Sequence, residues 1–335
     1  MSEIIKLTVP EARDLITGAL IGAGTARANA GYFAEAILDT ELSGLEGHGF
    51  YWLQFYCLHL RSGKVDGHAV PRVEAISESA FSVDAGNGFA HPAIEAGFRE
   101  LIPAAKRQGV AAMGVRRSYN AGTLGYHTGV LAKAGLVALG ATNSVPTIAP
   151  VGGSRPVIGT NPLSLAVPGA AGEIAFLIDQ SASAVAWTAV KRAADEGRPI
   201  PPGWALDAEG CATTNAIAGL AGSMAPAGGV KGFSIGLMVE VLCAALAGGN
   251  LGIDMGSFTD DDGRPVGNGQ FFVALDPHKF GGPTFLERIQ RLTTAIEAQP
   301  GARLPNARRT ASRQRLSREG LTLERALYER LKQFA

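Results

Sequence analysis

The chain has 335 residues, enough for one large core or two packed subdomains, and 46% of them are hydrophobic. Its 30 Lys and Arg residues balance its 30 Asp and Glu residues, so the net charge provides no attraction for nucleic acid or for an anionic membrane. The cysteines are widely spaced, which predicts reduced thiols without disulfides or a zinc site. No apolar run reaches about 18 residues and no signal peptide is visible, so we expect a cytoplasmic, globular protein without a membrane span.

The first predicted elements are three helices. One spans residues 8–23, because Thr8 and Glu11 have the spacing of a capping box and a proline lies in the first turn. Residues 25–43 follow, with apolar side chains at helical spacing and a threonine placed to cap them. A third helix is expected over residues 50–62, directly after a Gly-His-Gly turn. The N-terminal segment is therefore predicted to be mostly helical.

From about residue 73 the pattern changes to short β-type runs that alternate with Ala-rich helical stretches, which is typical of an α/β region. The predicted strands cover residues 81–84, 110–115, 136–140, 164–167, 174–178 and 270–275. The predicted helices of this part and of the chain that follows it cover residues 91–108, 232–247 and 283–298. A basic loop over residues 303–318 is expected to lead to a last helix near the C-terminus.

The common nucleotide-binding motifs are absent from this sequence. Residues 22–27, Gly-Ala-Gly-Thr-Ala-Arg, resemble the start of a dinucleotide fingerprint, but they follow a predicted helix rather than a strand. Arg27 also stands where a third small residue is needed for close packing. We interpret this segment as a helix-ending turn, and no P-loop, GxSxG or HExxH motif occurs elsewhere. Any bound dinucleotide is therefore not held by a standard Rossmann unit.

Of the six histidines, His48 has the most suggestive surroundings. Gly47 and Gly49 flank it at a turn before a predicted helix, so the backbone can expose the imidazole and bring a ligand close. An imidazole with an ordinary pKa of about 6.5 can donate a proton at neutral pH. The pattern leaves open the alternative that His48 is a solvated loop histidine.

Three further segments are compatible with phosphate groups. Residues 120–126 open an Ala-rich helix after a strand, where free N–H groups suit a diphosphate, although an ordinary helix cap explains them equally well. Lys231 lies next to glycines at the start of a long apolar helix, either as a phosphate partner or as a solvated residue near the cap. The basic run at residues 303–309 is of a kind that more often forms a solvated face than a binding site.

Together and in this order, these motifs resemble one family over essentially the whole chain. It is the malate/L-lactate dehydrogenase family, which includes ureidoglycolate, sulfolactate and diketogulonate dehydrogenases. Within it, the chain most resembles the Δ1-piperideine-2-carboxylate/Δ1-pyrroline-2-carboxylate reductases. The matching segments are His48-Gly49, Ser62 to Asp66, Ala149 to Gly153, Gly159 to Pro162, Ile178 to Ser181, Pro202 to Gly210, Lys231-Gly232 and Arg303 to Pro305. This ordered set is specific for the family and less specific for the branch.

The resemblance implies an α/β fold of the α+β type. Residues 76–275 would form a non-Rossmann cofactor domain with a largely antiparallel or mixed sheet. Residues 1–75 and 276–335 would form a helical domain that makes a homodimer. The implied cofactor is NADPH, with NADH as the alternative, and the implied reaction is hydride transfer between the nicotinamide and a small molecule.

The resemblance also implies roles for individual residues. His48 matches the proton donor to a carbonyl or imine, and Thr160 matches a substrate-contacting position. The residues that match cofactor-contacting segments are Asn120, Ala121, Gly122, Thr123 and Leu124; Asp179, Gln180 and Ser181; Val230 and Lys231; and Arg303, Leu304, Pro305, Asn306, Ala307, Arg308 and Arg309. Because a pair of guanidinium groups suits a 2′-phosphate, Arg308 and Arg309 predict a preference for NADPH.

Three positions depart from the family pattern. Gly47 stands where the family has the serine that assists the histidine, and Trp52 stands where it has the arginine that binds a substrate carboxylate. Ala189 replaces the aspartate at the other end of the proton relay in the reductase branch. Trp52, Trp187 and Thr188 are therefore predicted to line an altered substrate pocket, whose aromatic faces favour an iminium ion or a larger apolar group.

These residues predict an NAD(P)H-dependent reductase of a cyclic imine such as Δ1-pyrroline-2-carboxylate or Δ1-piperideine-2-carboxylate, with His48 as the proton donor. A 2-hydroxyacid dehydrogenase of the malate, lactate or ureidoglycolate type is the first alternative. A cofactor-binding relative with reduced or atypical activity is the second alternative, because the two positions that support the histidine are Gly47 and Ala189.

Overall fold

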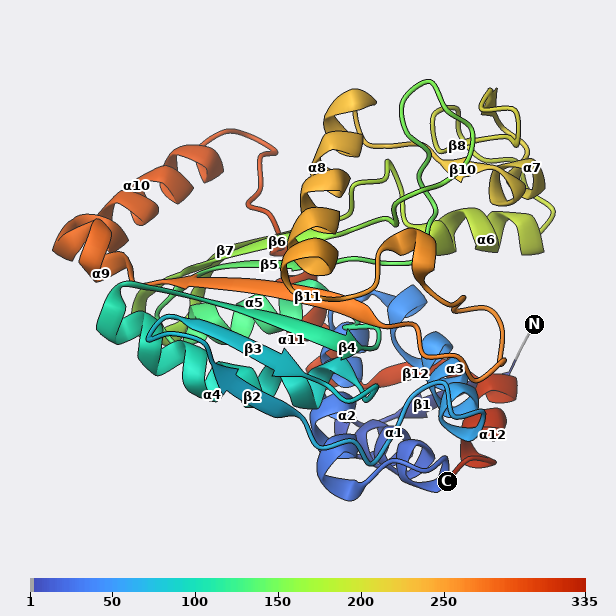
Figure 1. The fold of residues 1–335 in the computed structure, drawn as a ribbon, viewed down its shortest axis with the longest axis horizontal. Coiled ribbons are helices and arrows are strands. Elements are labelled where there is room, and N and C mark those ends of the chain that lie inside the picture. Colours follow the sequence, from blue (N-terminus) through green and yellow to red (C-terminus); the bar gives the residue numbers. More distant parts are fainter. Residues whose placement is uncertain (1–2) are drawn as a thin grey trace.

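The computed structural model describes residues 3–335 of the chain (Figure 1). The two ends of the chain lie side by side, because β1 pairs antiparallel with β12 from Ile4 opposite Glu324 to Leu7 opposite Leu321. We call the part that these strands and the neighbouring helices form the helical layer. Its elements are β1 (Ile4–Leu7), α1 (Val9–Gly22), α2 (Arg27–Leu42), α3 (Phe50–Arg61), β12 (Leu321–Glu324) and α12 (Arg325–Lys332).

The predicted capping box begins α1. The Glu11 N–H donates to the Thr8 hydroxyl at 3.4 Å, and the Thr8 N–H donates to the Glu11 carboxylate at 2.8 Å. The start of α2 differs from the prediction, since Ala26 is its N-cap and makes no side-chain cap. The hydroxyl of Thr25 is instead buried, with no hydrogen-bond partner in residues 3–335.

The middle of the chain forms a seven-stranded sheet in the order β2-β3-β4-β11-β5-β6-β7. Strands β3 and β4 run parallel, whereas the other neighbouring strands are antiparallel. The strands are β2 (Arg72–Ala75), β3 (Ala80–Asp84), β4 (Val110–Ser118), β5 (Val137–Thr142), β6 (Leu163–Pro168), β7 (Ile174–Gln180) and β11 (Asn268–Leu275). This mixed topology confirms the predicted non-Rossmann fold class, because a Rossmann sheet is mostly parallel.

Helices cover both faces of this sheet (Figure 1). Helices α4 (Ala90–Gln108) and α5 (Leu124–Lys133) pack on one face, and α8 (Val230–Glu240), continued by a π-helical turn at Val241–Leu246, lies on the other. The chain directly after this turn approaches the sheet closely at Gly114 of β4, where a Cβ atom would lie 2.8 Å from the Cβ of Ala247.

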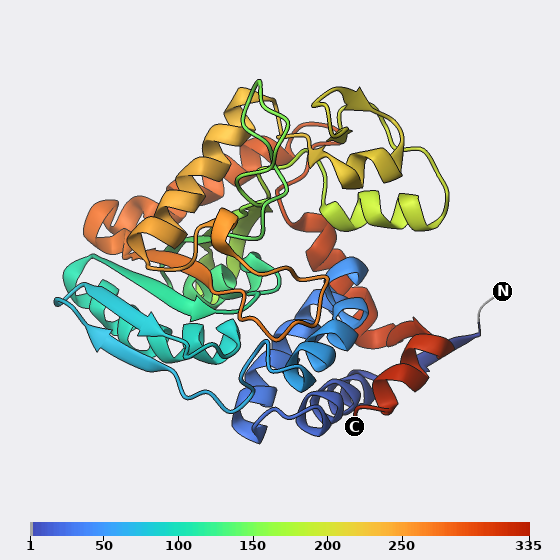
Figure 2. The same ribbon diagram turned by 45° about the vertical axis from the view of Figure 1, so that its right-hand side comes forward.

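A third part, the small-sheet unit, lies beside the sheet and on the same side of the molecule as the helical layer (Figure 2). Its elements are α6 (Trp187–Asp195), β8 (Ala205–Leu206), β9 (Ala212–Thr213), α7 (Ala216–Ala221) and β10 (Ser223–Met224). It has an apolar cluster of its own, formed by Ile148, Val190, Ile200, Met224 and their neighbours. The cluster fixes the start of α6, which carries two predicted site residues.

The C-terminal region corrects one prediction. The basic segment expected as a loop over 303–318 is largely helix α11 (Ala307–Glu319), which packs on α2 and is held there by the ion pair between Arg313 and Asp39 at 2.8 Å. Helices α9 (Pro277–Phe280) and α10 (Phe285–Glu297) precede it, and α10 lies beside β7. Short 3-10 turns occur at Glu46–His48, Ala170–Gly172, Gly252–Asp254 and Gly282–Thr284.

The proposed division into residues 1–75 with 276–335, and residues 76–275, stays a prediction. No helix within residues 3–335 combines the length and apolar character that crossing a membrane requires.

Candidate active site

A cavity of about 620 Å³ lies where the helical layer, the sheet and the small-sheet unit meet. It is bordered by segments from most of the length of the chain. The predicted site residues that line it are His48, Trp52, Asn120, Gly122, Thr123, Leu124, Thr160, Asp179, Gln180, Ser181, Trp187, Thr188 and Arg309. The fold therefore brings the predicted proton donor, the predicted substrate contacts, two of the predicted cofactor segments and Arg309 of a third to one cavity.

The position of His48 is fixed by the turn that contains it and by a carboxylate behind it. The His48 N–H donates to the Leu45 carbonyl at 2.8 Å, and two residues later the Phe50 N–H donates to the buried Glu41 carboxylate at 2.5 Å. Gly49 permits this approach, because a Cβ atom there would lie 2.0 Å from Glu41 Oε1. The sequence analysis did not identify Glu41 as a residue that supports the turn. Gly49, which makes room for its carboxylate, is the one feature of the sequence that could have indicated it.

Two opposite charges act on the imidazole of His48. Burial lowers the pKa of His48 below its usual value, the Asp179 carboxylate raises it and the Arg309 guanidinium lowers it. These two groups are themselves paired, with Arg309 Nη1 2.9 Å from Asp179 Oδ2, while Arg309 Nη2 donates to the Asp179 backbone carbonyl at 3.4 Å. Within residues 3–335 no group is hydrogen-bonded to the imidazole itself. It is therefore available to a ligand, and its neutral form predominates at neutral pH.

Two tryptophans border the cavity from different parts of the fold. Trp52 comes from α3, and its ring lies 5.1 Å from the ring of Phe55 and 6.4 Å from the ring of Tyr56. Trp187 comes from the first turn of α6 and packs against the core of the small-sheet unit. Aromatic neighbours and a packed core thus hold these two rings at the cavity, as the predicted aromatic wall requires.

The two altered relay positions contribute no polar side chain to His48. A Cβ atom at Gly47 would lie 3.3 Å from Thr188 Oγ1, so the Thr188 hydroxyl occupies the space next to the missing serine. Ala189 lies in α6 and is not among the described residues that line the cavity. The hydroxyls of Thr188 and Thr160 are two of the neutral hydrogen-bond donors that line the cavity.

The segment at residues 120–124 is a tight turn before α5. Asn120 Oδ1 accepts a hydrogen bond from the Gly122 N–H at 2.6 Å, and Gly122 has φ +64°, which favours glycine. His127 Nε2 lies 2.9 Å from the carbonyl of Ala121, which is buried and does not line the cavity. This turn presents the N-terminal end of α5 to the cavity, and such an end suits a phosphate group.

A second hollow, which we call the basic hollow, shares Leu45 and Arg309 with the cavity. Its predicted residues are Arg303, Leu304, Pro305, Asn306, Ala307, Arg308 and Arg309. Arg309 is bound to Asp179, whereas the described residues include no ion-pair partner for Arg308, and the predicted role of the two arginines at a 2′-phosphate stays a prediction. The cavity and the basic hollow are therefore neighbours, and the arginines of the basic hollow suit phosphate groups.

One predicted segment lies outside both hollows. Val230 and Lys231 begin α8, are exposed and line neither hollow. The backbone just before them contacts the chain next to a cavity-lining segment, since the Ala227 N–H donates at 2.8 Å to the carbonyl of Ala182, the residue after Ser181. Two segments that line the cavity were not predicted at all, because they carry no motif: Ser144 to Thr147 and Met255 to Thr259.

Comparisons with known proteins agree with this arrangement. A family model described as malate/L-lactate dehydrogenase matches residues 7–332. The chain is 42% identical to a (2R)-3-sulfolactate dehydrogenase (NADP(+)) from Chromohalobacter salexigens, over 100% of this chain and 99% of that protein. It is 35% identical to a Delta(1)-pyrroline-2-carboxylate reductase from Ancylobacter novellus, over 99% of this chain and 98% of that protein.

The same relationship holds in three dimensions. The crystal structure of delta1-piperideine-2-carboxylate reductase from Pseudomonas syringae pv. tomato matches with a TM-score of 0.93 and 35% identity, over 99% of this chain and 100% of that one. The resemblance stated from the sequence is therefore confirmed in family, and both substrate classes occur among the relatives. The chain belongs to the malate/L-lactate dehydrogenase family, whose members are NAD(P)-dependent dehydrogenases and reductases.

Proposed function

We propose that this enzyme is an NAD(P)H-dependent reductase of cyclic imines of the Δ1-pyrroline-2-carboxylate and Δ1-piperideine-2-carboxylate type, with His48 as the proton donor. The observation that carries the proposal is that one cavity is lined by His48 and by two aromatic side chains, Trp52 and Trp187. An aromatic face attracts a cation, so this cavity suits an iminium ion better than a neutral carbonyl. Relatives named for such reductases at 35% identity support the same substrate class.

The cavity and the basic hollow would hold the dinucleotide. The turn at residues 120–124 and the residues 179–181 line the cavity, and Arg308 lies in the basic hollow, where its guanidinium suits a 2′-phosphate. We therefore propose NADPH as the preferred cofactor, with NADH as the weaker one. The cofactor supplies the hydride for the C=N carbon.

The protein residues would position the substrate and balance its proton. Thr160 and Thr188 would donate hydrogen bonds to polar atoms of the substrate, and the tryptophan rings would exclude water from the reacting carbon. Addition of a hydride to a neutral imine needs one proton on nitrogen, which His48 would supply. An iminium substrate already carries that proton, so it depends less on an imidazole whose neutral form predominates.

A second candidate is a dehydrogenase of a small 2-hydroxyacid. It is favoured by the identity of 42% to the sulfolactate dehydrogenase from Chromohalobacter salexigens. In that case Arg309, a cation that lines the cavity, would face an anionic substrate, and His48 would protonate the carbonyl oxygen during reduction. A relative that binds the cofactor without ordinary turnover is the third candidate, because of Gly47 and Ala189.

A substrate screen separates these candidates. We would follow oxidation of NADPH and NADH with the two cyclic imine carboxylates, a cyclic imine without a carboxylate, pyruvate, oxaloacetate and sulfopyruvate. We expect kcat/KM for a cyclic imine to exceed that for every 2-oxo acid by about tenfold or more, which corresponds to about 1.4 kcal/mol. A preference for sulfopyruvate would support the second candidate, and binding of NADPH without turnover would support the third.

Assembly and location also stay proposals. We propose a cytoplasmic homodimer, on the basis of the family resemblance, and analytical ultracentrifugation of the purified protein tests the dimer.

A further inference from the structure

The side chain of Lys64 is 0% exposed, although a lysine is almost never fully buried unless it is paired. Its ammonium donates to the Ser257 carbonyl at 2.8 Å and forms an ion pair with Asp262 at 3.1 Å. A third, shorter contact joins it to Asp260. The three N–H donors of this group are thus all directed at one distant segment of the chain.

That segment, residues 251–266, is a loop whose two ends are hydrogen-bonded to each other; we call it the cavity loop. At its base the Asn250 N–H donates to the Gly267 carbonyl at 2.8 Å, and the Asn250 side-chain amide donates to the Val266 carbonyl at 3.1 Å. Apart from the 3-10 turn at Gly252–Asp254 it contains no helix or strand. In Figures 1 and 2 this orange segment runs from the foot of α8 down to α3 and back to β11.

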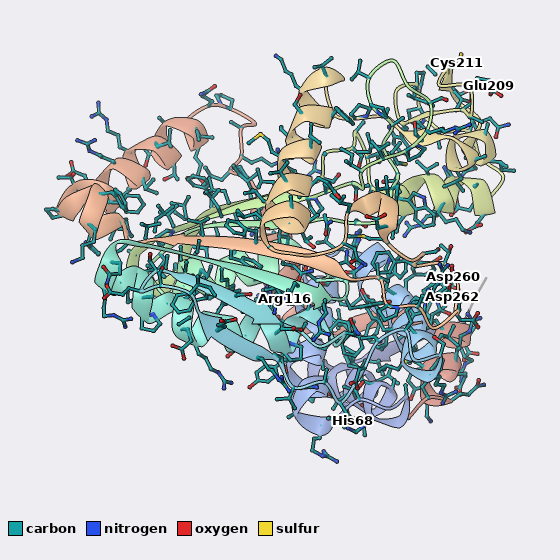
Figure 3. All side chains as sticks on the ribbon, in the orientation of Figure 1. His68, Arg116, Glu209, Cys211, Asp260 and Asp262 are labelled. Atoms are coloured by element: carbon teal, nitrogen blue, oxygen red, sulfur yellow. The ribbon has the colours of Figure 1, made fainter. Side chains whose placement is uncertain are left out.

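The cavity loop forms one wall of the candidate active site. The five residues that do so are Met255, Gly256, Ser257, Phe258 and Thr259. Its carboxylates lie beyond this wall, and Figure 3 shows Asp260 and Asp262 together at the edge of the molecule near α3. Lys64 therefore contacts the same short segment that borders the substrate, and it does so from outside the cavity.

Other contacts hold the cavity loop on the turn that carries Lys64. The Phe258 ring is buried and lies 5.5 Å from the ring of Tyr119. A Cβ atom at Gly263, which has φ +76°, would lie 2.8 Å from the Ser62 carbonyl, so the loop touches the backbone just before Lys64. Among the described residues, packing, the Lys64 ammonium and a hydrogen bond between His59 and the Asp260 backbone hold the middle of the loop, and no strand pairing fixes it.

We propose that Lys64 is a positioning residue for substrate binding, which clamps the cavity loop as a wall of the active site. The expected effect on substrate binding rests on the proposed function, whereas the expected hold of Lys64 on the cavity loop does not. Loss of the clamp would let the wall move outward at Met255 to Thr259. Contacts with the substrate would weaken, but the basic hollow and His48, which lie on other segments, would keep their geometry.

The burial of the three charges predicts which substitutions the fold tolerates. The Asp260 and Asp262 side chains are 42% and 31% exposed, so water can solvate them after Lys64→Met. The converse change, Asp260→Asn with Asp262→Asn, leaves a buried ammonium without a counter-charge, which is the more costly case. The double variant should therefore lower the thermal midpoint more than Lys64→Met does.

The test combines hydrogen exchange with kinetics on the full-length protein. Lys64→Met should speed amide exchange in peptides from residues 251–266 by about tenfold or more, as expected for the loss of even one of its charge-assisted hydrogen bonds, with little change elsewhere. The substrate KM should rise several-fold more than kcat falls, and the NADPH Kd, measured by fluorescence titration, should stay within a few-fold. The control is Arg325→Met, which breaks an exposed pair with Glu3 in which the cavity loop takes no part.

Two results would overturn the clamp. One is unchanged exchange in residues 251–266 of Lys64→Met; the other is faster exchange spread evenly over the chain, which indicates a general loss of stability. If Lys64→Met does not fold, Asp260→Asn alone serves as the second variant, because it removes one carboxylate partner of Lys64 that is itself partly exposed. It should also speed amide exchange in residues 251–266. Absence of turnover by the wild-type protein with any substrate would contradict the proposed function and leave the exchange experiment as the test of the clamp.

Discussion

Replacement of Trp52 by arginine should shift the substrate preference toward small carboxylates. Trp52 lines the cavity. Among the described residues that line it, Arg309 is the only arginine or lysine, and its guanidinium is already bound to Asp179. A guanidinium at position 52 would provide a bidentate partner for a carboxylate. Hydrogen bonds to charged groups contribute about 1.5–3 kcal/mol, so kcat/KM for pyruvate relative to a cyclic imine without a carboxylate should rise about 10- to 100-fold.

The same substitution removes the ring contacts of Trp52 with Phe55 and Tyr56. An aromatic pair contributes about 0.5–1.5 kcal/mol beyond its buried area, so we expect Trp52→Arg to lower the free energy of unfolding by about 1–3 kcal/mol. Trp52→Gln is the matched control, because it removes the ring without adding a cation. The assay is kcat/KM by NADPH oxidation for both substrates, with thermal unfolding of each variant. An unchanged substrate ranking in Trp52→Arg, or equal rankings for the Arg and Gln variants, would refute this reasoning.

Three other predictions concern pH, cofactor choice and stability. Because burial lowers the pKa of His48, kcat/KM for a substrate that brings no proton should fall as the pH rises through a value below about 6.5. Asp179→Asn removes the carboxylate that raises this pKa, so a pH–rate profile should show the fall at lower pH; a fall at higher pH would contradict the assignment. Arg308→Ala should weaken binding of NADPH about tenfold more than binding of NADH in fluorescence titrations, and equal losses would remove Arg308 from the 2′-phosphate site. Thr8→Ala should lower the unfolding free energy by about 1 kcal/mol in denaturant titrations through loss of the α1 cap, and an unchanged midpoint would contradict the value of the cap.

Local chemistry made much of the fold predictable. The capping box of Thr8 and Glu11 located the start of α1, and the apolar runs located strands of the central sheet. The convergence of His48 with Asp179 followed from the family resemblance and not from any pattern in either segment. A predicted cofactor segment at Val230 and Lys231 reached neither hollow, because α8 begins on the outer surface.

The features that sequence reasoning missed depend on contacts between distant residues. Helix α11 has no apolar stripe to signal it, and its place is fixed by Arg313 with Asp39 and by Arg309 with Asp179. Arginine is a good helix former, so the basic composition itself was compatible with a helix. The cavity loop likewise has no motif, and it is held by Lys64, which lies far earlier in the sequence, 193 residues before Ser257 and 196 before Asp260.

The most direct test of the account is the reaction catalysed by His48→Ala. Because a single general acid typically contributes about 10²–10⁴-fold, this variant should lose that much in kcat for reduction of Δ1-piperideine-2-carboxylate. Its Kd for NADPH should stay within a few-fold of the wild-type value, because the basic hollow and the turn at residues 120–124 lie on other segments. Near-normal kcat with a normal pH profile in His48→Ala would contradict the central claim and assign the proton to another group or to water.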